Sequence, residues 1–253
     1  MDERELLQGR IRELSRTAYE RDIPRHTDFL SLSEQALFYD IKREDIFGRY
    51  VFFGGYDDAE RRILFFLPEY IDEEEHFLET VSCVRAEPLN AKFADKLSHR
   101  DFLGALMNLG IERSKTGDII TGEDCAYIFC LKEVEELICS ELLKVKHTSI
   151  RAYSVPLSQC DIRPEMKELS VNVASERADA VISAVFNLSR TVSSQLIASE
   201  SVFADGRLIT QPSAVLKEGA RISVRGYGKF IFMGVSGNTR KGRLYINIKK
   251  YVS

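Results

Sequence analysis

The amino-acid sequence predicts an α+β protein built from three small domains. The chain has 253 residues, enough for one large domain or for two to three small ones. Segments whose apolar residues recur at helical spacing alternate along the chain with segments typical of strands. Charge is divided unevenly between the first two thirds of the chain and the last third. With 44% apolar and 29% charged residues, the composition is that of a globular protein and excludes wholesale disorder.

We expect a cytoplasmic protein without a membrane segment. Residues 2–5 are all charged and no apolar signal-peptide core follows them. The most apolar short run, residues 63–67, is far below the roughly 18 residues that span a bilayer. The cysteines are odd in number and none has CxxC spacing, which is typical of reduced thiols. Cys125 and Cys130 are interpreted as buried thiols, with a metal pair as the alternative, so no metal or cofactor is expected.

Residues 1–76 are predicted to form an N-terminal α/β domain. Apolar residues recur at helical spacing over residues 7–18, and the helix should end before Pro24. A second helix is expected near Ser33, whose hydroxyl can cap it. Two strands, over 49–53 and 62–67, should follow around a Gly54-Gly55 turn. The acidic run at 72–75 is interpreted as a solvated break between domains.

Residues 77–158 are predicted to form a split-βαβ middle domain. Ser98 and Asp101 are placed to cap its first helix, and Gly110 to end it. The expected elements are strand 80–86, helix 98–109, strands 118–121 and 126–131, helix 134–142 and strand 148–155. This order is that of ferredoxin/RRM-like domains, a common scaffold that indicates no function by itself.

Residues 159–176 are interpreted as a connector, and residues 177–253 as a basic C-terminal domain of two short helices and several strands. This last segment has twelve basic and four acidic residues, net +8, whereas residues 1–176 have 23 basic and 35 acidic residues, net −12. No acidic residue occurs from Gly219 onward. Such segregation favours a polyanionic partner that meets one end of the molecule, with a merely soluble tail as the alternative.

The C-terminal segment resembles the S4 RNA-binding domain, named after a protein of the small ribosomal subunit. The resemblance is carried by Arg177-Ala178-Asp179, Leu188-Ser189-Arg190, Leu196-Ile197, Val202, Gly206, Pro212, Gly219 and Ile222. It implies two helices on a small sheet, with Arg177 and Arg190 meeting phosphates near helix starts. Where the family usually has a basic residue, a glycine and an asparagine, this chain has Val192, Glu200 and Asp205. We therefore expect binding to depend more on the downstream basic strands.

Motifs along the whole chain resemble the YlmH-type proteins of Firmicutes and their cyanobacterial relatives. These motifs are Gly54-Gly55-Tyr56-Asp57-Asp58-Ala59-Glu60-Arg61, Ser98-His99-Arg100-Asp101-Phe102-Leu103-Gly104-Ala105, Gly117-Asp118-Ile119 and the segments 222–230 and 237–243. The resemblance implies a non-catalytic RNA-binding protein of the cytoplasm that acts on the large ribosomal subunit in ribosome-associated quality control. It would handle stalled peptidyl-tRNA complexes, with ribosomal RNA, tRNA or both as partners, and is expected to be a monomer. The acidic first two domains are expected to position the basic module or to meet cationic ribosomal proteins.

The candidate RNA-binding residues are cations and one hydroxyl of the C-terminal domain. They are Arg177, Ser189, Arg190, Arg207, Arg225, Lys229, Arg240, Lys241 and Arg243. The hydroxyl of Ser189 can cap its helix or contact RNA. Tyr227 and Phe230 either stack on unpaired bases or belong to the core. His99-Arg100-Asp101 is interpreted as a helix start, with acid–base chemistry as the alternative.

The alternative function is an RNA-modifying enzyme with an appended S4 domain. In pseudouridine synthases a catalytic aspartate follows a Gly-Arg-Leu stretch, but here Ile209 follows Gly206-Arg207-Leu208. The sequence has no P-loop, no G-x-S-x-G elbow, no complete G-x-G-x-x-G and no HExxH. No catalytic residue is therefore assigned.

Overall fold

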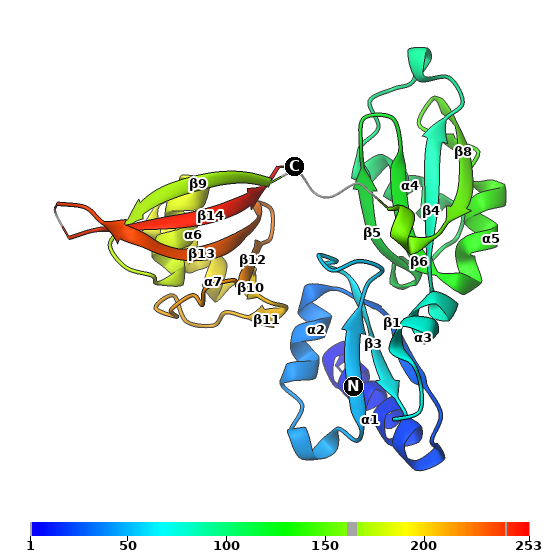
Figure 1. The fold of residues 1–253 in the computed structure, drawn as a ribbon, viewed down its shortest axis with the longest axis horizontal. Coiled ribbons are helices and arrows are strands. Elements are labelled where there is room, and N and C mark those ends of the chain that lie inside the picture. The colour runs from blue at the N-terminus through cyan, green and yellow to red at the C-terminus, as the bar shows by residue number, and fades with distance from the viewer. Residues whose placement is uncertain (1, 161–165, 241, 253) are drawn as a thin grey trace. The chain divides into compact units, whose positions relative to one another are not determined.

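The computed structural model describes residues 2–160, 166–240 and 242–252. Residue contacts divide the chain into two compact units, Met1–Arg163 and Pro164–Ser253. Each unit combines helices with antiparallel sheets (Figure 1), which confirms the predicted α+β multi-domain class. Within the described ranges, no helix is both long enough and apolar enough to cross a membrane.

The N-terminal part of unit 1 is a three-stranded antiparallel sheet with helices. Its elements are α1 (Glu3–Arg21), β1 (Arg25–Leu30), α2 (Leu32–Tyr39), η1 (Arg43–Asp45), β2 (Arg49–Phe53), β3 (Arg62–Leu67) and α3 (Glu73–Thr80). The strands lie in the order β1-β3-β2. Both long helices begin with a capping box, because Asp2 pairs with Glu5 and Ser31 with Glu34.

The middle part of unit 1 is a five-stranded antiparallel sheet in the order β5-β6-β4-β8-β7. Its elements are β4 (Val81–Pro88), η2 (Ala91–Phe93), α4 (His99–Asn108), η3 (Arg113–Lys115), β5 (Thr116–Thr121), β6 (Ala126–Leu131), α5 (Lys132–Glu141), β7 (Lys144–Val145), β8 (Thr148–Val155) and η4 (Leu157–Gln159). Without the short edge strand β7, this is the sequence of elements expected for a split βαβ arrangement. Gly110 ends the α4 segment with φ +79°, a left-handed conformation that glycine adopts easily.

The two sheets of unit 1 share an apolar core. Alternate residues of β3 face different neighbours: Leu64 and Phe66 pack with α1 and α2, whereas Ile63 and Phe65 pack with Phe129 of β6. The opposite face of the middle sheet packs with α4 and α5. Apart from Arg62 at the start of β3, the strands β3 and β6 are apolar because both of their faces are covered. The parts expected as separate domains, 1–76 and 77–158, therefore form one compact unit.

Unit 2 is a six-stranded antiparallel sheet with two short helices. Its elements are β9 (Met166–Val173), α6 (Ala178–Phe186), α7 (Arg190–Ala198), β10 (Val202–Ala204), β11 (Arg207–Leu208), β12 (Arg221–Val224), β13 (Gly228–Asn238) and β14 (Leu244–Tyr251). The strands lie in the order β11-β10-β12-β13-β14-β9, and the helices pack on one face of the sheet around Val181, Ile197, Phe232 and Ile246.

Three segments differ from the sequence-based expectation. The acidic run at 72–75 is the N-cap and first turn of α3, since carboxylates stabilise a helix N-terminus. Strand β1 was not expected, because its buried positions do not alternate regularly. Eight of the eighteen residues of the expected connector, 159–176, form strand β9, which pairs with β14 over the whole of its length. That pairing joins segments more than seventy residues apart, which local patterns do not reveal.

Candidate nucleic-acid interface

Four cations of unit 2 gather at one end of the sheet face opposite the helices. Arg221 of β12 pairs with Ile231 of β13, which in turn pairs with Lys249 of β14. Two residues before Ile231 along β13, Lys229 pairs with Ser223 of β12. Paired residues of neighbouring strands point to the same face. The adjoining β12–β13 turn carries Arg225. We name Arg221, Arg225, Lys229 and Lys249 the outer-face cluster.

Aromatic rings support two cations of the outer-face cluster. The Arg225 guanidinium carbon lies 5.4 Å from the ring centre of Phe203, and the Lys229 ammonium lies 5.9 Å from that of Tyr251. Both distances are within the range of cation–π attraction. The rings hold the aliphatic stems at the sheet and thereby limit where the charges can move.

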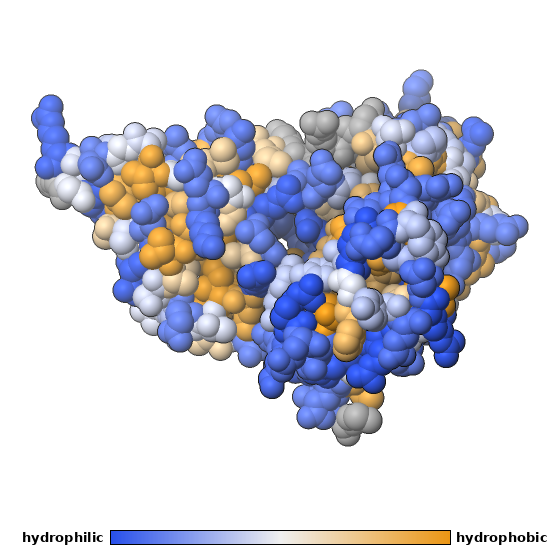
Figure 2. Space-filling view, turned by 60° about the horizontal axis from the view of Figure 1, so that its bottom comes forward, coloured by the Kyte–Doolittle hydropathy of each residue, from blue (hydrophilic) through white to orange (hydrophobic). Residues whose placement is uncertain are grey.

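Apolar side chains also lie exposed on unit 2. Figure 2 shows them on this unit, at the left, among hydrophilic residues. The large exposed apolar and aromatic residues of the unit are Val215, Tyr227, Met233, Val235, Tyr245 and Val252. The sequence left two alternatives for Tyr227 and Phe230, stacking on unpaired bases or a place in the core, and the two residues differ in burial. Phe230 is fully buried and cannot stack on a base, whereas Tyr227 is 41% exposed beside Phe186.

Arg177 and Arg190 are brought together by a buried carboxylate. Asp179 accepts hydrogen bonds from Arg177 Nε at 3.1 Å and Nη2 at 3.0 Å, and from Arg190 Nη2 at 2.7 Å. Its side chain is only 5% exposed, whereas those of the two arginines are 42% and 48% exposed. Burial alone would raise the pKa of Asp179, but the hydrogen bonds from the arginines outweigh it and lower the pKa. The sequence analysis did not identify Asp179 as their partner.

The remaining candidates are spread over the unit. Ser189 accepts a hydrogen bond from the Val192 amide at 3.1 Å and so caps α7. Arg207 lies on the edge strand β11. Arg240 and Arg243 lie near the β13–β14 connection, at the opposite end of β13 from Lys229 and about 30 Å from it by strand length. Lys241 lies outside the described residues.

The structure thus divides the described candidates into separate groups. Arg225 and Lys229 belong to the outer-face cluster, and Arg177 and Arg190 share Asp179 at the starts of the helices that cover the other face. Arg243 donates to the Asn172 carbonyl at 2.9 Å at the far end of the sheet. A single surface that unites all nine residues is therefore not present among the described residues. The outer-face cluster brings together four cations of the described residues.

Two of the motifs singled out in the sequence meet in unit 1. Asp118 accepts hydrogen bonds from the Tyr56 hydroxyl at 2.8 Å, the Glu60 amide at 2.7 Å and the Arg61 amide at 3.1 Å. Burial, followed by the charge of Asp118, raises the pKa of Tyr56. A Cβ atom on Gly55 would lie 2.2 Å from the ring of Phe129, so only glycine fits there. These motifs fix the N-terminal sheet to the middle sheet.

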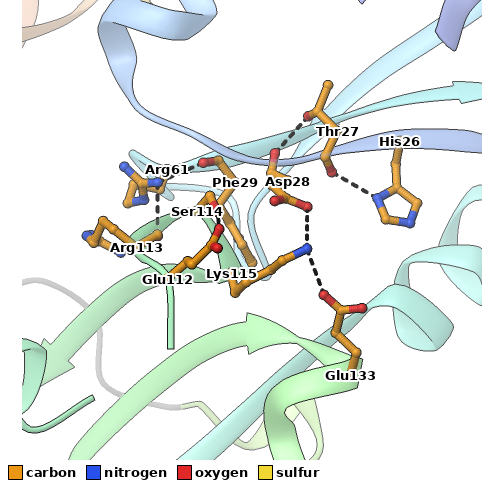
Figure 3. Close-up of polar contacts among 10 residues, drawn as sticks. All are labelled: His26, Thr27, Asp28, Phe29, Arg61, Glu112, Arg113, Ser114, Lys115 and Glu133. Carbon is orange, nitrogen blue, oxygen red and sulfur yellow. Dashed lines mark hydrogen bonds and ion pairs between the residues drawn. The ribbon is translucent and has the colours of Figure 1, made fainter. Parts of the chain in front are cut away.

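Arginines complete this junction as hydrogen-bond donors (Figure 3). Arg61 donates to the carbonyls of Phe29 at 2.7 Å, Thr116 at 3.0 Å and Arg113 at 3.2 Å. Burial, with the nearby charge of Arg61, lowers the pKa of Arg113 to about 10. Lys115 lies between two carboxylates, 3.0 Å from Asp28 and 2.8 Å from Glu133. Arg61 and Lys115 therefore stabilise the contact between the two sheets.

The motif that starts at Ser98 also has a structural role. Asp101 accepts hydrogen bonds from the Ser98 amide at 2.8 Å and hydroxyl at 2.7 Å, which closes the N-terminus of α4. The interpretation of His99-Arg100-Asp101 as a helix start is confirmed. Among the residues that the structure describes, no three His, Cys, Asp or Glu side chains are grouped to hold a metal ion.

Comparisons with known proteins place an RNA-binding class of domain in the middle of the chain. Residues 84–159 match the family model described as "Putative RNA-binding domain in YlmH". The "Ribosome-associated protein quality control protein P2" of Bacillus subtilis (strain 168) is 29% identical over 228 residues, which cover 88% of this chain and 86% of that protein. Together these findings support a YlmH-type family for the chain, the family that its motifs predict.

A solved structure is similar as well. It is the "Cell division protein ylmH from Streptococcus pneumoniae", with 22% identity and a TM-score of 0.48 over 63% of this chain and 95% of that one.

The matched segment lies outside the sequence-based candidates. None of the nine candidate residues lies within 84–159. The sequence analysis followed net charge and therefore concentrated on the C-terminal third. Within the matched segment, residues 92–100 and 144–148 carry cations and are joined by hydrogen bonds, although the segment as a whole is not basic.

Proposed function

We propose that this chain is a non-catalytic RNA-binding protein of ribosome-associated quality control. It binds ribosomal RNA, tRNA or both on the large ribosomal subunit and acts on stalled peptidyl-tRNA complexes. The observation that carries the proposal is the match of residues 84–159 to the YlmH RNA-binding domain. The relative from Bacillus subtilis, whose name assigns it to ribosome-associated quality control, supports the same process.

The chemistry of unit 2 supports RNA as the ligand. The outer-face cluster presents cations beside exposed aromatic and apolar side chains, a combination that suits phosphates and unpaired bases. The resemblance of this unit to an S4 domain agrees with that role. Arg225 and Lys229 are the cluster members that the motifs and the geometry both select.

The test is an RNA titration of the full chain across a series of salt concentrations. Arg225→Gln/Lys229→Gln should weaken binding to ribosomal RNA and tRNA alike. The dependence of log affinity on log salt should become shallower by about 0.7–0.9 per lost phosphate contact. Arg12→Gln, a partly exposed cation of unit 1 paired with Asp45, is the control and should leave binding unchanged. If the chain binds neither RNA nor large subunits, the proposal is wrong.

A second assay tests the alternative function, an RNA-modifying enzyme. Mass analysis of RNA incubated with the protein should find no change in the RNA. Modification beyond one equivalent per protein would show an RNA-modifying enzyme instead.

A further inference from the structure

The charge of the middle domain is segregated although its sum is small. Residues 84–159 contain ten basic and eleven acidic residues, net −1. Four of the acidic residues lie on one helix, α5, at Glu133, Glu135, Glu136 and Glu141. Cations instead collect in the loop after β4, the first turn of α4 and the β7–β8 hairpin. We name residues 89–100 together with 143–149 the basic end.

Hydrogen bonds hold the two segments of the basic end side by side. The Leu89 amide donates to the Ser149 carbonyl at 2.9 Å, and the Asp95 amide donates to the Thr148 hydroxyl at 2.9 Å. The His147 amide donates to the Asp95 carboxylate at 3.3 Å. In Figure 1 the loop after β4 extends beyond the end of the middle sheet, near β8. The two segments thus form one surface despite the fifty residues between them in sequence.

Two carboxylates within or next to the basic end, Asp95 and Asp101, already have hydrogen-bond partners. Asp101 receives Lys146 Nζ at 2.8 Å together with the two hydrogen bonds from Ser98. The Lys146 hydrogen bond and then those from Ser98 lower the pKa of Asp101 to about 2. The carboxylate of Asp95 accepts the hydrogen bond from the His147 amide of the hairpin. Lys146 thus neutralises Asp101, and Asp95 makes no ion pair with the exposed, described cations beside it.

Four cations of the basic end are exposed and make no ion pair with a described residue. They are Lys92, Lys96, Arg100 and Lys144. Lys146, which pairs with Asp101, has a positive φ of 53° in the hairpin turn. Glycine or asparagine would adopt this left-handed conformation at lower energy, so lysine is an uncommon choice there. The left-handed backbone conformation of Lys146 therefore raises the energy of the hairpin turn that exposes this lysine.

We propose that the basic end is the surface through which the middle domain binds the sugar-phosphate backbone of RNA. This inference rests on the proposed function, since it names a second site on an RNA-binding protein. Exposed cations without acidic partners can exchange bound counterions for phosphates, whereas α5 repels them. It revises the sequence-based expectation that the acidic first two domains leave RNA to the C-terminal domain.

The test compares two double variants of the full chain with equal changes in charge. Lys96→Gln/Lys144→Gln removes two cations of the basic end. Lys42→Gln/Lys132→Gln removes two exposed lysines elsewhere in unit 1, each of which has an acidic partner. The first variant should lower RNA affinity and make its salt dependence shallower by about 0.7–0.9 per lost contact, whereas the control should match the unaltered protein. Equal behaviour of the two variants would overturn the inference.

Further measurements separate the causes of failure. If Arg225→Gln/Lys229→Gln weakens binding but Lys96→Gln/Lys144→Gln does not, the inference is wrong and the proposed function stands. A protein partner at this end would instead involve Leu89 and Leu143, which are 67% and 63% exposed. Loss of ribosome association in Leu89→Ser/Leu143→Ser, with unchanged binding to bare RNA in the lysine variant, would also refute an RNA site. Crosslinks from bound RNA to peptides covering 92–100 or 144–147 are expected, and their absence would count against it.

Discussion

Replacing Asp179 by asparagine tests whether the buried carboxylate holds unit 2 together at the starts of its helices. The substitution keeps the size of the side chain but removes its charge. One of its two oxygens becomes an amide that faces guanidinium groups, so at least one of the bonds from Arg177 and Arg190 is lost.

The expected loss follows from the exposure of the partners. A hydrogen bond to a charged group contributes about 1.5–3 kcal/mol when buried, and an exposed ion pair about 0.2–1 kcal/mol. Asp179 is 5% exposed, but the arginines are 42% and 48% exposed, so each arginine should contribute between these limits. We expect Asp179→Asn to lower the free energy of unfolding by about 2 kcal/mol. For a unit of this size, that corresponds to a fall in Tm of about 8–16 °C.

The effect should depend on pH in a defined direction. Because the pKa of Asp179 is lowered in the folded state, its contribution is present above the unfolded pKa near 3.9 and is lost as pH falls through the folded value. The difference in stability between the two proteins should therefore be constant between about pH 5 and pH 8 and shrink below about pH 4.

Calorimetry of the full chain measures this difference, and hydrogen exchange of peptides from 178–198 assigns the transition to unit 2. Glu168→Gln, at a carboxylate that is 79% exposed and paired with Lys249, should change the free energy of unfolding by less than about 0.5 kcal/mol. A loss in Asp179→Asn that persists undiminished at pH 3, or no loss at neutral pH, would refute the reasoning.

Two further predictions concern the junction in unit 1. Asp118→Ala should lower the free energy of unfolding by about 2–4 kcal/mol in urea, because it leaves the Tyr56 hydroxyl and two amides without an acceptor, whereas Asp124→Ala at an exposed site should change little. Gly55→Ala should destabilise by about 2 kcal/mol or more, since φ is +100° and the added Cβ meets Phe129. Its control is Gly104→Ala in α4, where nothing lies within 4 Å and a gain of about 0.5–1 kcal/mol is expected. Equal effects at the two glycines would contradict the close packing described.

Local chemistry in the sequence was enough to predict much of the fold. Helix α1 follows from its apolar spacing, and the start of α4 from Ser98 and Asp101. The order of elements in the middle domain was also correct. Long-range pairing could not be predicted in this way. Strand β9 has only weak alternation and exists because β14 pairs with it, and the shared core of the two sheets depends on which neighbour each face of β3 meets.

The site was less predictable than the fold for a related reason. The motif at 54–61 contains several charged residues, yet the amides of Glu60 and Arg61 donate to Asp118, which lies 58 and 57 residues further along the chain. Arg177 and Arg190 were selected as free cations, but Asp179 already binds both. The fraction of a cation's charge that is available to a ligand depends on its folded neighbours.

Net charge along a segment is therefore a poor measure of where a polyanion binds. The first 176 residues sum to −12, but screening limits each charge to a range of about 8–10 Å at physiological salt. A phosphate at the basic end therefore responds to Lys96 and Lys144 far more than to carboxylates beyond that range. Since three of the four carboxylates of α5 lie in the first half of that helix and the acidic run 72–75 belongs to the start of α3, the same composition leaves a cationic surface exposed. An acidic body and an RNA-binding middle domain are thus compatible, because affinity depends on how charges are grouped in space.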